Sequence, residues 1–351
     1  MDRNNNINVF AGCVGQGLYK STDGGLNWLN CNNPEMSHEG EVRALAVHPL
    51  EPNVLYAGTR QGCYRSIDNG DSWTHLKSGM ENRSIWSLLI LPDNPEIIFA
   101  GTGPGALFRS KDEGNSWECL NSGMPEKCSP PNKAFKMDTR VIILLADPDI
   151  KNRIWAGLEI GGLFRSDDLG ETWKSCNSGV STENPYTQGL DIHSLTILPE
   201  DNGRQKTLLA VEESGVCKST DDGENWERLD FNHHLFPWHY VRGIKQRPDR
   251  PETLFLGNGT GPAINQTAWT SPDYGGAAWR SINAGITWQK MEFPVEPNSL
   301  IYDFAVNSFD PDRVYAFSLF GQIYLSKDGG DNWEKLTQQF PEIRHMSWTK
   351  T

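Results

Sequence analysis

The chain has 351 residues, of which 37% are hydrophobic, and carries a formal net charge of −13 at pH 7. Because a surface for nucleic acid or an anionic membrane needs a basic face, this charge argues against both partners. Residues 1–8 contain no apolar run typical of a signal peptide, no later segment is long enough to span a membrane, and the seven Cys are an odd number, so we expect a cytoplasmic protein.

The first recurring element along the chain is an octet that begins with Ser and ends with Trp. It appears as STDGGLNW, SIDNGDSW, SKDEGNSW, SDDLGETW, STDDGENW, SINAGITW and SKDGGDNW, at residues 21–28, 66–73, 110–117, 166–173, 219–226, 281–288 and 326–333. Repetition at such intervals is typical of units that bury their apolar faces only against one another. The chain is therefore predicted to be a radial array of seven repeats.

Each octet has the composition of a tight turn between two strands. The Asp carboxylate can accept hydrogen bonds from backbone N–H groups, Gly allows a positive φ, and Trp starts the return strand as an apolar anchor. Two apolar strands precede each octet, as in VRALAVHP and VLYAGTRQGCYRS around the second copy. With the strand after Trp, this predicts four short antiparallel strands per repeat.

The predicted fold is an all-β, seven-bladed β-propeller of four-stranded antiparallel blades, forming one domain over residues 1–351. The chain starts at NVFAGCVGQGLYKS, which matches the second and third strands of other repeats. The C-terminal IRHMSWT, residues 343–349, matches the innermost strands VRALAVH and IWSLLIL. We therefore expect the C-terminal strand to pair into the first blade and close the ring, which leaves no open edge.

The octets resemble the Asp-box, or bacterial neuraminidase repeat, of the sialidase-like propellers; the sixth copy departs from this pattern with Asn283 in place of Asp. The resemblance implies a scaffold turn on the face opposite the active site. Sialidases bind a carboxylate with three Arg and use a Tyr nucleophile, a Glu partner and an Asp acid. This chain offers a similar inventory in Arg43, Arg242, Arg344 and Tyr302, but it has seven repeats where sialidases have six blades.

Aligning the innermost strands gives a ring of candidate functional residues at the channel mouth. The second position of each strand is Arg43, Trp86, Ile142, His193, Arg242, Tyr302 and Arg344. Strands buried on both faces are normally apolar, so polar side chains there indicate a site. In this interpretation the three Arg stabilise negative charge and His193 and Tyr302 transfer protons, all five being catalytic. In the alternative, the Arg side chains pair with acids such as Glu41 or Asp303 and line a wet channel.

Six further residues are predicted to bind substrate around this ring: Trp86, Arg140, Glu159, Glu212, Trp238 and His239. Trp238 and His239 belong to the loop DFNHHLFPWHY, whose His spacing fits no strong metal motif, so neither a metal nor a cofactor is expected. Glu159 and Glu212 lie in loops between second and third strands. Two carboxylates across a pocket can hydrolyse a glycosidic bond, one as acid and the other as base or nucleophile.

The leading functional hypothesis is an enzyme for a small anionic, polarised or aromatic organic substrate bound at the channel mouth. The sequence does not distinguish a lyase, a hydrolase and an arene-alkylating cyclase, and it leaves the oligomeric state open. Two alternatives remain. One is a noncatalytic module that binds a glycan or a protein, and the other is a glycosidase that uses a Glu pair.

Overall fold

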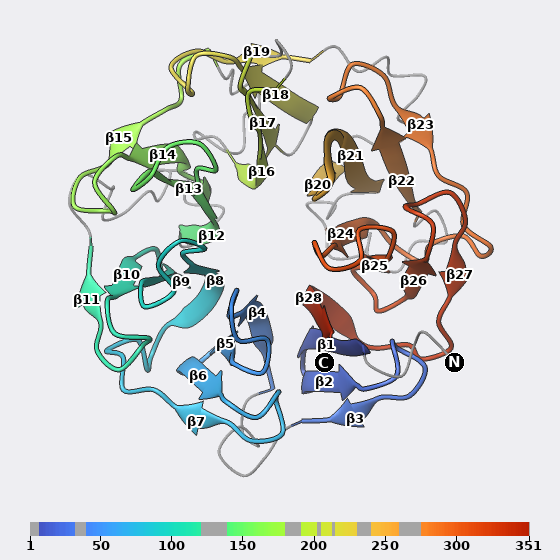
Figure 1. Ribbon diagram of the computed structural model, residues 1–351, viewed down its shortest axis with the longest axis horizontal. Coiled ribbons are helices and arrows are strands. Elements are labelled where there is room, and N and C mark those ends of the chain that lie inside the picture. Colours follow the sequence, from blue (N-terminus) through green and yellow to red (C-terminus); the bar gives the residue numbers. More distant parts are fainter. Residues whose placement is uncertain are drawn as a thin grey trace, which may run out of the picture.

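The computed structural model describes residues 7–31, 40–120, 139–179, 191–201, 205–212, 215–229, 240–259 and 275–350. Its regular elements in these ranges are β-strands, which form seven four-stranded antiparallel sheets. Figure 1 shows the sheets as blades arranged in chain order around a central channel. The predicted all-β, seven-bladed propeller is therefore confirmed. Among the described residues, no helix is long and apolar enough to cross a membrane.

Each blade runs from an innermost strand at the channel to a short outer strand. Blade 1 is composed of β28 (Glu342–Lys350), β1 (Ile7–Val14), β2 (Gly17–Ser21) and β3 (Leu29–Asn30). Blades 2 to 4 are composed of β4 (Val42–Val47), β5 (Leu55–Thr59), β6 (Gly62–Ser66) and β7 (Thr74–His75); β8 (Ser84–Ile90), β9 (Ile98–Gly103), β10 (Leu107–Ser110) and β11 (Glu118–Cys119); and β12 (Arg140–Ala146), β13 (Ile154–Glu159), β14 (Gly162–Ser166) and β15 (Lys174–Ser175). Blades 5 to 7 are composed of β16 (Ile192–Leu198), β17 (Thr207–Glu212), β18 (Gly215–Ser219) and β19 (Glu227–Arg228); β20 (Tyr240–Arg247), β21 (Arg250–Gly259), β22 (Gly276–Ser281) and β23 (Gln289–Lys290); and β24 (Ile301–Ala305), β25 (Val314–Ser318), β26 (Ile323–Ser326) and β27 (Glu334–Lys335).

The C-terminal strand closes the ring as predicted. β28 pairs antiparallel with β1, with Phe10 opposite Ser347 and Ile7 opposite Lys350, and it forms the innermost strand of blade 1. Trp348 on β28 is fully buried, and its indole Nε1 donates to the Ala305 carbonyl of blade 7 at 3.3 Å. The strand thus supplies both an edge partner for blade 1 and apolar packing against blade 7.

The seven octets form turns with nearly the same hydrogen bonds. In the second octet, Ser66 Oγ donates to Asp68 Oδ1 at 2.8 Å and accepts from the backbone N–H of Gly70 at 2.8 Å. The same carboxylate oxygen accepts from the N–H of Ser72, and Trp73 Nε1 donates to the Gly70 carbonyl. Asn283 in the sixth octet accepts the equivalent bond from Thr287 at 2.9 Å through its amide oxygen. The amide therefore replaces the carboxylate without loss of the turn.

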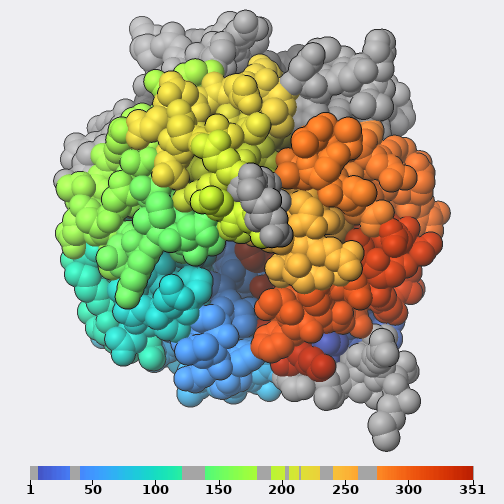
Figure 2. All heavy atoms as spheres, turned by 45° about the horizontal axis from the view of Figure 1, so that its top comes forward, coloured from blue at the N-terminus to red at the C-terminus, as the bar shows by residue number. Residues whose placement is uncertain are grey.

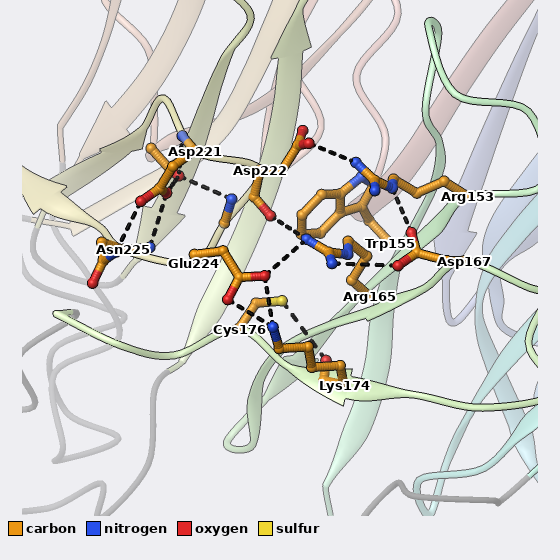
Figure 3. Close-up of polar contacts among 12 residues, drawn as sticks. Arg153, Trp155, Arg165, Asp167, Lys174, Cys176, Asp221, Asp222, Glu224 and Asn225 are labelled. Carbon is orange, nitrogen blue, oxygen red and sulfur yellow. Dashed lines mark hydrogen bonds and ion pairs between the residues drawn. The ribbon is translucent and has the colours of Figure 1, made fainter.

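A second set of contacts holds four of the turns against the preceding blade. Arg165 on β14 donates from Nη1 to the Asp222 carbonyl of the fifth octet at 2.6 Å, and its guanidinium lies 3.4 Å from the Glu224 carboxylate, as Figure 3 shows. The same kind of bond from the residue before an octet to the next octet's fourth carbonyl recurs at Arg65, Arg109 and Arg280. Since guanidinium groups donate several bonds in one plane, one side chain can satisfy a carbonyl and an acid together.

The apolar core lies between neighbouring blades. One cluster, for example, combines Tyr56 and Leu76 of blade 2 with Ile98 and Phe108 of blade 3. The sheets approach closely where a glycine follows an alanine in the second strand: a Cβ added at Gly58 would lie 2.6 Å from Ile85 Cγ2 of the next blade. This spacing explains why the AG pair recurs along the chain, and it brings the innermost strands together at the channel.

Candidate active site at the channel mouth

A β-bulge lies at the same point of all seven innermost strands. In blade 2, Val42 pairs with Thr59 and Ala44 with Gly58, so Arg43 is left over between them. The register shifts at the corresponding position in each of the other blades, across Trp86, Ile142, His193, Arg242, Tyr302 and Arg344. Bulges turn side chains away from the regular alternation of a strand and are frequent next to functional sites. The seven aligned ring positions are therefore the seven bulged residues.

The centre of the ring is hollow in the space-filling view of Figure 2. Three guanidinium groups at the mouth lie against the Trp86 indole. The guanidinium carbons of Arg43 and Arg140 lie 4.2 and 4.5 Å from the centre of the indole, and that of Arg344 lies 5.9 Å away. Such contacts are favourable cation–π interactions. Because guanidinium groups already lie against the indole ring, we do not assign Trp86 a role in stacking against a sugar ring.

All three ring arginines have a carboxylate partner. Arg43 Nη2 lies 2.8 Å from Glu41 Oε2, and Arg344 pairs in the same way with Glu342, two residues before it on β28. Asp303, by contrast, pairs with Lys245 at 3.2 Å and not with an Arg. This pattern matches the alternative expectation for Glu41, while the expected Asp303 partnership is wrong. Because carboxylates offset the charges of the ring arginines, the ring is a weaker anion site than three uncompensated cations would form.

A phenol lies between two of these arginines, Arg242 and Arg344. Tyr302 Oη accepts from Arg242 Nη2 at 3.1 Å and from Arg344 Nη1 at 3.2 Å. Burial raises the pKa of Tyr302, but the positive charges of Arg242 and Arg344 outweigh burial and bring it below its ordinary value. Tyr240, which receives only a 3.4 Å bond from Arg242 Nη1, has its pKa raised by burial.

Next to Arg242, blades 4 and 5 bring together two carboxylates and an imidazole. Donor atoms of Glu159, Asp191 and His193 all lie within 4.8 Å of one another. Arg140 Nη1 contacts Glu159 Oε2 at 2.6 Å, and Arg242 Nη1 lies 3.6 Å from Oε1. Because two guanidinium groups already contact Glu159, we assign no metal site to this cluster.

Asp191 is the residue of this cluster that the sequence interpretation did not include. It precedes β16, and one of its oxygens lies 3.3 Å from His193 Nε2, while Nδ1 of His193 lies 2.8 Å from the Val241 carbonyl. Burial raises the pKa of Asp191, but His193 and Arg242 outweigh it, so the net pKa falls below the ordinary value. An acid also stands two residues before the ring residue at Glu41 and Glu342, and that spacing is a signal in the sequence that points to Asp191.

The remaining predicted substrate-binding residues are Glu212 and two residues outside the described ranges. Glu212 ends β17 opposite Ile192, but its carboxylate contacts Arg228 Nη2 of the outer strand β19 at 3.1 Å. Trp238 and His239 fall outside the described ranges. The partner that the structure brings to Glu159 is therefore Asp191 and not the expected Glu212.

Fold and channel together define a seven-bladed β-propeller protein with a polar cluster at the channel mouth. The chain belongs to the family of the DUF6242 beta propeller domain, whose family model matches residues 148–350. The expected β-propeller is thus supported, whereas this match does not support the finer resemblance to the Asp-box repeat and to sialidases.

Similar proteins include glycoside hydrolases. The chain is 25% identical over 346 residues to an oligoxyloglucan-reducing end-specific xyloglucanase of Emericella nidulans. The alignment covers 86% of this chain but only 41% of that protein. The fold resembles that of the GH74 xyloglucanase from Xanthomonas campestris, with a TM-score of 0.65, 16% identity and coverage of 97% of this chain and 52% of the other. A putative 6-phosphogluconolactonase from Bacteroides uniformis gives a TM-score of 0.63 at 13% identity, covering 98% and 100%. The two structural likenesses concern the fold alone.

Proposed function

We propose that the protein hydrolyses glycosidic bonds in a glucan of the xyloglucan type, with Glu159 and Asp191 as its carboxylate pair. The observation that carries the proposal is the approach of these two carboxylates within 4.8 Å. In retaining glycosidases the two carboxyl groups are about 5–5.5 Å apart, and in inverting enzymes they are farther apart. The sequence similarity to a xyloglucanase supports the choice of substrate.

The local environment favours a specific role for Asp191. His193 and Arg242 favour its ionised form, which suits attack on the anomeric carbon or stabilisation of positive charge there. Glu159 lies across this position and is held by Arg140 from the start of its own blade's innermost strand. The pair therefore has one carboxylate fixed by an imidazole and the other by guanidinium groups.

The test is release of reducing ends from xyloglucan oligosaccharides by the purified protein. Asp191→Asn and Glu159→Gln are each expected to lower turnover by about 10²–10⁴-fold, because each removes a group that acts in the transition state. Glu212→Gln is the matched control and is expected to keep most of the activity, since Glu212 contacts Arg228 on the outer strand. Thermal unfolding of all three variants checks that they are folded.

Two outcomes would overturn the proposal. The first is a parent protein that releases no reducing ends but binds the same oligosaccharides, which would favour the noncatalytic glycan-binding alternative. The second is an Asp191→Asn variant that matches the parent in turnover while Glu212→Gln does not. Proton magnetic resonance of the first-formed product then decides the stereochemistry, and retention of the anomeric configuration is expected from the carboxylate separation.

A further inference from the structure

The proposed carboxylate pair lacks an evident proton donor, and this inference rests on the proposed hydrolysis. Breaking a glycosidic bond requires a group that protonates the leaving oxygen. The pKa of Asp191 lies below its ordinary value, and Glu159 accepts a hydrogen bond from Arg140 and forms an ion pair with Arg242. A guanidinium group can only donate, so it engages the Glu159 oxygens as acceptors. A side chain at the mouth that carries its own O–H is therefore the better candidate for the proton donor.

Tyr302 has the hydrogen-bond geometry of such a donor. Its phenolic oxygen accepts from both Arg242 and Arg344, and a guanidinium N–H can only donate. The phenol must therefore direct its own proton elsewhere, and within the ranges that the structure describes it has no acceptor. The side chain is half-buried at the bulge of β24, on the channel side of blade 7.

The charged groups around Tyr302 also favour its role as a proton donor. Arg242 comes from β20 and Arg344 from β28, with their guanidinium carbons 5.0 and 5.3 Å from the centre of the phenol ring. The neighbouring Asp303 is engaged by Lys245. Two nearby cations stabilise the phenolate, so they make the phenol a stronger acid than an ordinary tyrosine.

Arg242 also connects the phenol to the carboxylates. Its two terminal nitrogens contact different groups, Nη2 the Tyr302 oxygen and Nη1 the Glu159 carboxylate. The phenol and the carboxylate pair are thus separated by a single guanidinium group. A glycosidic oxygen bound beside Arg242 would therefore lie between the carboxylate pair and the phenol.

We propose that Tyr302 is the catalytic proton donor, giving its O–H proton to the leaving glycosidic oxygen. As Asp191 bonds to the anomeric carbon and the bond from that carbon to the glycosidic oxygen breaks, the oxygen takes the phenolic proton and leaves as an alcohol, while Arg242 and Arg344 stabilise the phenolate. Water then displaces Asp191, leaving a hydroxyl group on the anomeric carbon and returning a proton to the phenolate. The sequence consumes one water and needs no other co-reactant.

The first test compares leaving groups. Tyr302→Phe is expected to lower turnover of the natural oligosaccharide by about 10²–10⁴-fold but turnover of an aryl glycoside with an acidic phenol leaving group by less than tenfold, because such a leaving group needs no protonation. Tyr240→Phe removes the neighbouring phenol as a control and is expected to leave this ratio unchanged. Equal losses on both substrates, or no loss on either, would overturn the role.

The second test does not depend on activity. The ultraviolet difference spectrum between the parent and Tyr302→Phe is expected to show one tyrosine that ionises at lower pH than an ordinary tyrosine, whereas the difference against Tyr240→Phe is expected to show one that ionises later. A Tyr302 signal that does not precede that of Tyr240 contradicts the proposal. If the parent hydrolyses no glycoside, the proposed function fails and the donor role with it, while this titration still decides whether Tyr302 is an acidic phenol.

Discussion

The octet turns and the channel bulges are both repeated seven times, yet only the turns repeat their side chains. In the turns, Ser, Asp or Asn, Gly and Trp keep the same places, since most of their hydrogen bonds close within eight residues. At the bulges, the same backbone feature carries Arg, Trp, Ile, His or Tyr.

The difference follows from where the partners come from. A turn satisfies its own polar groups, so each copy faces the same local requirement and the same residues meet it. A bulged residue meets side chains from other blades, as Arg242 of blade 6 meets Glu159 of blade 4 and Tyr302 of blade 7. Different neighbourhoods around one channel therefore allow different side chains at the seven bulges, and chemistry can concentrate there without disturbing the scaffold.

The largest expected loss of stability follows from removing β28, which belongs to the scaffold and also carries a residue of the channel mouth. Ending the chain after Phe340 removes β28, which carries Arg344 at the mouth and the buried Ile343, Met346 and Trp348. Burying each such side chain contributes about 1.5–3 kcal/mol, and domains are stable by only about 5–15 kcal/mol, so the truncated protein should show no cooperative unfolding transition in denaturant. Adding a peptide of residues 341–351 should restore the transition. A truncated protein that unfolds like the parent would show that β28 is dispensable for the scaffold.

A smaller loss of stability is expected from substitutions at the contacts between blades that Figure 3 shows. Arg165 and Lys174 both contact Glu224, but Arg165 is largely buried and also holds the Asp222 carbonyl, whereas the Lys174 side chain is 56% exposed. Arg165→Met should lower the free energy of unfolding by about 1–3 kcal/mol, because it leaves a carbonyl unsatisfied. Lys174→Met should leave it nearly unchanged, because exposed ion pairs contribute little. Equal effects in urea unfolding would mean that exposure does not govern these contacts.

The smallest loss of stability is expected from a substitution within a single octet turn. Asp68→Ala should lower stability by about 1 kcal/mol, since it removes acceptors for Ser66 and Ser72 in a solvated turn, and should leave catalysis unaltered. Asp68→Asn should be close to the parent at neutral pH, because Asn283 already holds the equivalent turn. An Asp68→Asn variant as unstable as Asp68→Ala would show that the turn requires a charge.

Acidification provides the control for this turn. Although burial raises the pKa of Asp68, hydrogen bonds from Ser72 and Ser66 outweigh it and bring the folded-state pKa below 3.8, its ordinary value. The contribution of the charge is therefore present above pH 3.8 and lost as the pH falls through the lower, folded value. Any advantage of the parent over Asp68→Asn in urea unfolding should disappear across that interval, and an advantage that grows on acidification would contradict the assigned sign.

Much of the fold and part of the site could be predicted. The octet spacing indicated the number of blades, and the match of IRHMSWT to other innermost strands indicated the closing strand. The alignment of innermost strands also located Arg43, His193, Arg242, Tyr302 and Arg344 at equivalent positions. It did not indicate which of them would meet, so Glu212 was chosen as the partner of Glu159 although Asp191 lies beside it.

By itself, the sequence determined the propeller, its seven blades and the turns that join their outer strands, because turn hydrogen bonds and strand alternation are satisfied between near neighbours in the chain. Only the tertiary structure decided the chemistry of the mouth. The contact between Arg242 and Tyr302 joins residues 60 positions apart, and the approach of Glu159 to Asp191 depends on how two blades pack around the channel. A guanidinium that stabilises a phenolate or a carboxylate does so over a few ångströms of space, and those few ångströms are set by the closed ring.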